Sequence, residues 1–228
     1  MPGNSTPLSA QELNLIIETN TEHRIIVIDD FLADPDAARD LALRTEYHKD
    51  PIYPGYRSTR VSLLEQLGEC FEKLIGQPIF SLESLFQYQT AENEGQSFIH
   101  GDPCNWAGVL YLSKDHDGEP GTSFYRHQAT GQTQIKVGAD LMFEAIEKKV
   151  EPIEIVKMTG DDRMNSEKWD CRYTVPIRYN RLALYNARQF HRNGTAWGSE
   201  PANARLIQGF FIATEKSATL KSPITPIT

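Results

Sequence analysis

The segment His100-Gly-Asp-Pro-Cys-Asn-Trp-Ala-Gly-Val-Leu-Tyr-Leu-Ser113 joins a polar pair to a strongly apolar run. Residues 107–112 predict a buried β-strand, because their apolar side chains are nearly continuous and turn-forming residues flank them. His100 and Asp102 precede that strand and stand two positions apart. Residues two apart in extended backbone point to the same side. The imidazole and the carboxylate can therefore converge on one ion.

The rest of the chain from Ser84 onward has the same strand-like character. Turns rich in Gly, Pro, Asn and Asp separate the short runs, which suggests a β-sandwich or jelly roll. The other expected strands are residues 85–89, 122–125, 182–185 and 206–212.

The first third of the chain predicts helices that buttress this β region. Ser9-Ala-Gln-Glu12 has the form of a capping box for a helix that ends before Asn20. Residues 24–28 predict a strand, and Asp34-Pro35 begins a second helix through about Tyr47. A third helix is expected over about 61–74.

We expect one domain over residues 1–228, in which 1–80 form the helical buttress and 81–228 the β fold. A stretch at about 130–175 interrupts the β region, and its part 138–149 has a helical pattern with an apolar face. Insertions of this length are often binding loops or lids. Two roles remain open for its far part. In one, it closes over the site and Trp169 or Arg163 contacts substrate, and in the other Trp169 only anchors the insertion to the barrel.

Composition narrows the classes of partner. The net charge of −8, without a basic run, argues against binding to nucleic acid or to anionic membranes. No stretch of about 18 apolar residues and no leader-like start occurs, so no membrane span is expected. Three cysteines without a CxxC spacing fit a reduced cytoplasm. Nothing in the sequence indicates the oligomeric state.

His191 lies 89 residues after Asp102 and follows the expected strand at 182–185. Two histidines and one carboxylate form the facial triad that holds Fe(II) and leaves three coordination positions open. His127 is a rival third ligand, although it lies in an expected turn after residues 124–126.

The order of these motifs resembles the prolyl-hydroxylase-like branch of the Fe(II)- and 2-oxoglutarate-dependent oxygenases, in an uncharacterised bacterial subfamily. That family has the HxD pair, a "YLS" strand, a "GGT-x-F" turn, a distal histidine and then a basic residue on a following strand. Tyr111-Leu-Ser113, Gly121-Thr-Ser-Phe124, His191 and Arg205 follow this order here. The turn departs from the pattern at Glu119-Pro120, and the loop between His191 and Arg205 is longer than usual.

The resemblance implies a double-stranded β-helix (jelly-roll or cupin-like) fold and assigns roles to several residues. His100, Asp102 and His191 would hold the iron, with no catalytic residue beyond these ligands. Arg205 would bind the distal carboxylate of 2-oxoglutarate, and Arg192 is the alternative. Tyr111 would donate a hydroxyl hydrogen bond to the same carboxylate, and Tyr88 would contact the other end of the co-substrate.

The implied activity is that of a dioxygenase that uses Fe(II), 2-oxoglutarate and O₂. It would hydroxylate an unactivated C–H of an amino acid, peptide or small natural product and release succinate and CO₂. Two alternatives remain open at this point. One is a non-catalytic, cupin-like metal- or ligand-binding protein, and the other is an oxygenase-fold regulator with residual activity.

Overall fold

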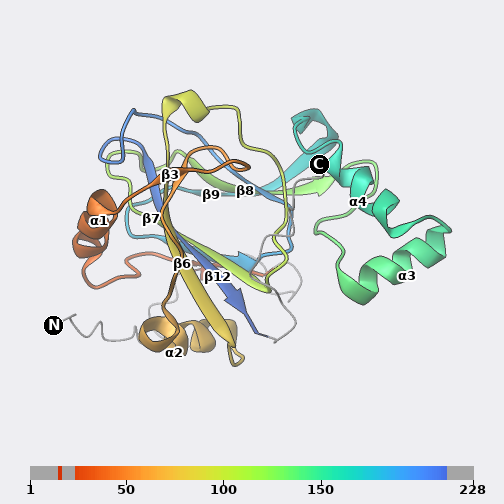
Figure 1. Ribbon diagram of the computed structural model, residues 1–228, viewed down its shortest axis with the longest axis horizontal. Coiled ribbons are helices and arrows are strands. Elements are labelled where there is room, and N and C mark those ends of the chain that lie inside the picture. The colour runs from red at the N-terminus through yellow and green to blue at the C-terminus, as the bar shows by residue number, and fades with distance from the viewer. Residues whose placement is uncertain (1–14, 17–23, 215–228) are drawn as a thin grey trace.

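Two antiparallel sheets form the core of the computed structural model, which describes residues 15–16 and 24–214 (Figure 1). The larger sheet has the order β1 (Leu15–Ile16), β2 (Ile25–Ile28), β10 (Leu182–Asn186), β7 (Trp106–Tyr111), β12 (Arg205–Ala213), β6 (Ser81–Gln89), β4 (Tyr56–Arg57) and β3 (His48–Lys49), and β5 (Val61–Ser62) also pairs with β6. The smaller sheet has the order β11 (His191–Asn193), β8 (Pro120–His127) and β9 (Trp169–Pro176).

The path of the chain between the sheets defines the fold. From β6 onward the chain moves from the larger sheet to the smaller sheet and back, in the sequence β6, β7, β8, β9, β10, β11 and β12. A bridge between His100 and His191 adds the segment before β7 to the edge of the smaller sheet. Antiparallel strands that wind in this way around one interior form a double-stranded β-helix. The fold expected from the sequence is confirmed.

Two helices cover the outer face of the larger sheet. α1 (Pro35–Arg44) begins at Asp34, whose side chain accepts the backbone N–H of Ala37, with proline at the first helical position. α2 (Leu64–Ile75) ends at Gly76, which has a φ of 82° that favours glycine. The ring of Phe71 on α2 packs 5.1 Å from that of Phe210 on β12. These contacts fix α2 on the sheet.

The beginning of the chain differs from the expectation at two places. Leu15–Ile16 pairs as β1 with Val27 and Ile26, so these two residues are not helical, and the rest of the helix expected up to residue 20 lies outside the described residues. Val61–Ser62 is also a short strand, paired with Ser84 and Glu83, and α2 begins only at Leu64. Pairing to the sheet overrides helical propensity at both places.

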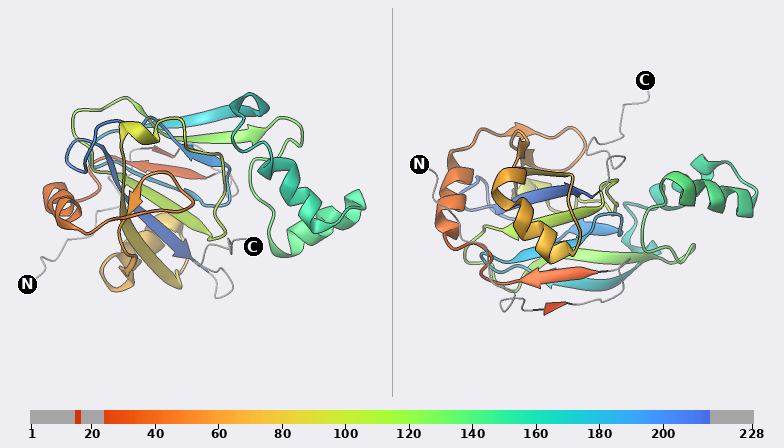
Figure 2. Two further views of the ribbon diagram at one scale, coloured as in Figure 1. Left: turned by 45° about the horizontal axis from the view of Figure 1, so that its top comes forward. Right: turned by 90° about the horizontal axis from the view of Figure 1, so that it is seen from below.

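The stretch between β8 and β9 contains α3 (Gly138–Lys148) and α4 (Pro152–Gly160), which project away from the β core (Figures 1 and 2). Both helices leave large apolar side chains in solvent. Within residues 24–214, Ala91–Asn93 and Ser166–Lys168 form 3-10 helices. Residues 169–175, which we had assigned to the insertion, instead belong to β9 of the smaller sheet. None of the helices in residues 24–214 is both long and apolar enough to cross a bilayer.

Candidate metal centre

The segment that carries His100 and Asp102 is bound to the loop and strand that carry His191. His100 and His191 exchange backbone hydrogen bonds of 3.0 and 2.7 Å, and the N–H of Asp102 donates to Ala187 O at 2.8 Å. Gly101 lies between His100 and Asp102, where a larger residue would not fit. A Cβ at this position would lie 2.5 Å from Arg188 O and collide with the backbone. The tight backbone pairing therefore brings together residues that are far apart in the sequence.

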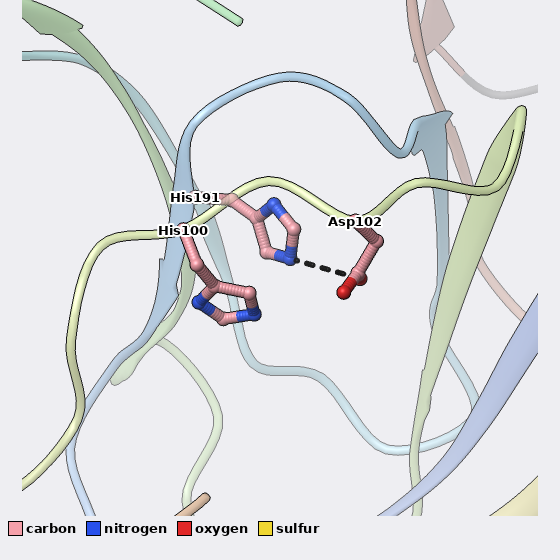
Figure 3. Close-up of side chains that lie close together, drawn as sticks. All are labelled: His100, Asp102 and His191. Carbon is pink, nitrogen blue, oxygen red and sulfur yellow. Dashed lines mark ion pairs between the residues drawn. The ribbon is translucent and has the colours of Figure 1, made fainter. Parts of the chain in front are cut away.

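His100, Asp102 and His191 converge on one point (Figure 3). One potential ligand atom from each residue lies within 4.8 Å of the other two, and His191 Nε2 is 3.7 Å from Asp102 Oδ2. The ring centroids of the two histidines are 4.4 Å apart. Two imidazoles and one carboxylate grouped on a single side are the donors of a facial triad.

Hydrogen bonds orient both imidazoles for this role. His100 Nδ1 lies 3.1 Å from Phe98 O, and His191 Nδ1 lies 2.8 Å from Gln189 O. A carbonyl oxygen only accepts, so Nδ1 carries the proton and Nε2 keeps its lone pair for an ion. Burial, reinforced by the neighbouring His191, lowers the pKa of His100 to about 4. His100 is therefore neutral near pH 7, as a metal ligand must be.

The triad lies in the wall of a cavity of about 300 Å³. Apolar side chains of the larger sheet, including Val109 and Ile207, line one side, and residues 50–60 line another. The triad thus has open space in front of it, as an ion that binds further ligands would need.

Arg205 is a completely buried cation at the start of β12. Its Nη2 donates to Gly121 O at 3.1 Å and its Nη1 to Gln89 Oε1 at 3.4 Å, while its Nε has no partner among the residues that the structure describes. No carboxylate in residues 24–214 forms an ion pair with Arg205, and burial lowers its pKa. A buried charge without a counter-charge is costly, so this environment suits an anionic ligand.

Tyr111 is buried next to Arg205. Its ring centroid is 5.9 Å from Arg205 Cζ, and its hydroxyl bonds Thr122 Oγ1 at 2.8 Å. A Cβ at Gly121 would lie 2.6 Å from that hydroxyl and 2.7 Å from Val175 O, so this position of β8 requires glycine. Arg205 and Tyr111 do not line the cavity, whereas Tyr185 does and is close enough to act on the pKa of Arg205.

Tyr88 lies on the opposite face of the larger sheet. Its ring stacks on Tyr56 with centroids 4.8 Å apart and contacts Tyr47 edge-on at 4.8 Å. Side chains alternate along β6, so Gln87 faces the cavity and Tyr88 does not. The assignment of Tyr88 to a co-substrate site is therefore wrong for geometric reasons.

The two residues expected to contact substrate occupy different environments. Trp169 is buried against His127 and Phe190, and its indole N–H donates to Asp162 O at 2.9 Å. It anchors the stretch between β8 and β9 to the core. Arg163 is exposed and lies 4.9 Å over the ring of Phe98. No residue from 128 to 168 lines the cavity.

The two rival assignments differ from His191 and Arg205 in their contacts. His127 is buried, with Nδ1 3.0 Å from Thr130 Oγ1 and Nε2 3.0 Å from Asp162 Oδ2, so both of its ring nitrogens are engaged. Arg192 lies over the ring of Tyr125 at 5.4 Å and is partly exposed.

Several cavity residues were not identified from the sequence. The side chains of Gln87 and Tyr185 point to the same face of the larger sheet as those of Arg205 and Tyr111. The alternation of side chains along the strands could have revealed this. Arg57 and Tyr53 come from the proline- and glycine-rich stretch after residue 50, where no periodicity exists to orient side chains. The cavity is therefore more polar than the sequence alone indicated.

Comparisons with known proteins give one family and several similar structures. The model of a family of unknown function, DUF6445, matches residues 10–212, whereas no curated protein matches the chain.

Three solved structures are similar to this chain over most of its length. A 2OG-Fe(II) oxygenase family oxidoreductase from Burkholderia pseudomallei has a TM-score of 0.47 and 11% identity, with 85% of this chain and 86% of that chain covered. HygX from Streptomyces hygroscopicus, with nickel, 2-oxoglutarate and hygromycin B bound, has a TM-score of 0.47 and 14% identity over 90% and 87%. A prolyl-4-hydroxylase from Pseudomonas putida has a TM-score of 0.45 and 13% identity over 85% and 94%. Because its family model spans most of the sequence, this chain belongs to the DUF6445 family.

Proposed function

We propose that this protein is an Fe(II)- and 2-oxoglutarate-dependent dioxygenase that hydroxylates a small substrate. The convergence of His100, Asp102 and His191 beside an open cavity carries the proposal. When bound together, Fe(II) and 2-oxoglutarate supply the chemistry, in which O₂ oxidises the co-substrate to succinate and CO₂ and inserts oxygen into a C–H bond. The mixed nitrogen and oxygen donors fit Fe(II), and the donors on one side leave positions free for co-substrate and O₂.

The residues around the triad hold and orient the reactants in this proposal. Arg205 binds the distal carboxylate of 2-oxoglutarate, which supplies the missing counter-charge and a partner for Nε. Tyr111 positions Arg205 and adds a hydroxyl beside it. Because Arg205 lies behind the cavity wall, the co-substrate reaches it only if a side chain at that wall, such as Tyr185, moves aside.

The apolar part of the cavity excludes water from the reacting atoms. Val109, Ile207 and Phe211 present hydrocarbon to the triad side of the cavity. A dry environment strengthens the charge interactions of the bound anions and protects the substrate from side reactions. These side chains contribute to the reaction only by shaping the cavity.

Succinate release tests this proposal. The protein is stripped of metal with a chelator, then supplied with Fe(II), 2-oxoglutarate and O₂, and succinate is quantified over time. We expect slow succinate formation without substrate that requires both Fe(II) and the intact triad. A protein that binds Fe(II) but neither binds 2-oxoglutarate nor forms succinate would be a metal-binding protein without turnover, and the proposal would be overturned.

A further inference from the structure

The segment between β3 and β5 forms part of the cavity wall. Residues 50–53, 57, 58 and 60 line the cavity together with the triad. Two arginines belong to this lining, Arg57 and Arg60, and Arg60 forms an ion pair with Glu83 at 3.3 Å. The side chain of Arg57 is 18% exposed, so most of its guanidinium is removed from water.

Arg57 is held in place by its neighbours. Its Nη1 lies 3.4 Å from Asp50 Oδ2, and its Cζ lies 4.2 Å over the ring of Tyr53. Asp50 Oδ1 accepts the backbone N–H groups of Ile52 and Tyr53 at 2.8 and 2.7 Å. Asp50 therefore folds the turn as well as pairing with the arginine. The guanidinium is preorganised, which lowers the entropy lost when it binds a ligand.

The charge of Arg57 is incompletely satisfied. Its Nε is buried and has no hydrogen-bond partner within the described part of the chain. Burial lowers the pKa of Arg57, and the nearby carboxylates of Asp50 and Asp102 offset this effect only in part. A buried donor without a partner is unfavourable unless a ligand satisfies it. An anion in the cavity would do so.

Arg57 also lies close to the triad. The ring of Tyr53, which carries the guanidinium on its face, is 5.2 Å from the ring of His100. Phe98 stacks on Tyr53 at 5.3 Å and contacts His100 at 5.1 Å. An anion on Arg57 would therefore bring the body of its molecule next to the ion held by the triad.

We propose that Arg57 binds a carboxylate of the primary substrate, so that the cavity takes a small free carboxylic acid with an apolar body. This inference rests on the proposed function and names its substrate class. Val109, Ile207 and Phe211 would contact the apolar body, while a bidentate guanidinium contact would fix the carboxylate. An internal residue of a peptide has no free α-carboxylate, so a peptide without aspartate or glutamate at the reacting position would not be selected.

The experiment uses the full-length protein loaded with Mn(II) and 2-oxoglutarate without O₂, and propanoate and propanamide as probes. Affinities for Mn(II) and 2-oxoglutarate are measured first in every variant. Binding of each probe is then followed by the relaxation that Mn(II) induces in the probe protons, an effect confined to molecules close to the metal. Propanamide matches propanoate in shape but carries no charge.

We expect saturable binding of propanoate and much weaker binding of propanamide to the wild type. Arg57→Met should weaken propanoate binding by about tenfold or more, since one charge-assisted contact is lost. Its affinities for Mn(II) and 2-oxoglutarate should stay unchanged. Arg57→Lys should lose less, because the charge remains. Arg126→Met, which removes an exposed arginine paired with Asp170, is the matched control and should bind propanoate like the wild type.

Three results would overturn this inference without contradicting the proposed function. They are equal binding of the two probes, unchanged propanoate binding in Arg57→Met, or a loss of 2-oxoglutarate affinity in that variant, which would make Arg57 the co-substrate ligand. If Arg57→Met does not fold, binding of the two probes to the wild type and to Arg57→Lys still tests the inference. A wild type that takes up neither Mn(II) nor 2-oxoglutarate overturns the proposed function, and this inference with it.

Discussion

The two faces of the larger sheet carry side chains of different kinds, although both come from the same strands. The outer face is apolar except for the hydrogen-bonded pair Ser84 and Gln208 and is closed by α1 and α2, with Leu82, Leu110, Leu182, Leu184, Leu206, Phe210 and Ile212 in its core. The inner face has smaller apolar residues mixed with buried polar ones, namely Ala107, Val109, Ala183 and Ile207 beside Gln87, Gln89, Tyr111, Tyr185 and Arg205. The outer face supplies stability, and the inner face leaves room and charge for ligands.

Phe210→Ala on the outer face should give the largest change in stability. The side chain is buried, contacts Phe71 across the helix–sheet interface, and would leave a cavity. We expect the free energy of unfolding to fall by about 3–5 kcal/mol. Urea denaturation of the metal-free protein measures it. A loss under about 1 kcal/mol would mean that the outer face is not the main source of stability.

Arg205→Met on the inner face should weaken ligand binding without lowering stability. Loss of a charge-assisted contact should weaken 2-oxoglutarate binding by about 1.5–3 kcal/mol, roughly ten- to hundredfold. Stability should not fall, because a buried charge without a carboxylate partner is replaced by an apolar side chain of similar length. Titration of the Mn(II)-loaded variant with 2-oxoglutarate gives the affinity. Unchanged affinity would refute the role of Arg205.

Two tyrosines offer a smaller contrast between the faces. Tyr111→Phe removes a buried hydroxyl beside Arg205 and should raise the KM for 2-oxoglutarate by an amount equivalent to about 0.5–1.5 kcal/mol. Tyr88→Phe is the control on the outer face and should leave that KM unchanged. Steady-state succinate release measures both. An effect of Tyr88→Phe as large as that of Tyr111→Phe would contradict the assignment of the two faces.

Phe143→Ser should have the smallest effect. Phe143 is 70% exposed on α3, a helix that covers neither sheet face. Surface substitutions of this kind change stability by about 0.5 kcal/mol or less. Urea denaturation beside Phe210→Ala gives a direct comparison of two phenylalanines. A loss comparable to that of Phe210→Ala would show that α3 packs against the core in solution.

Strand periodicity explains how much of this arrangement could be predicted from the sequence. The motif order predicted the double-stranded β-helix, and it singled out the three residues that converge in the metal centre. Tyr88 directly follows Gln87 on β6, and Gln87 pairs with Ile207, so the alternation of side chains along the strand predicts that Tyr88 lies on the face opposite the cavity. The same alternation would have identified Gln87 and Tyr185 as inward-facing.

Other features could not be predicted because no periodic signal encodes them. β9 contains a register irregularity opposite Phe124 and Tyr125 and has no clean alternation, so it was read as part of an insertion. Arg57 is oriented by an aspartate turn and a tyrosine ring, which are tertiary contacts. α3 and α4 project away from the β core (Figure 2), and the apolar pattern of a helix does not encode the direction in which the helix projects.

Metal stoichiometry tests the central claim most directly. The wild type, His191→Ala and His127→Ala are titrated with Fe(II) without O₂, and bound iron is counted per folded chain. The account predicts one tightly bound ion in the wild type and in His127→Ala, whose ring nitrogens are already engaged. It predicts loss of that ion in His191→Ala. Full iron content in His191→Ala, or its loss only in His127→Ala, would contradict the assignment of the metal centre to His100, Asp102 and His191.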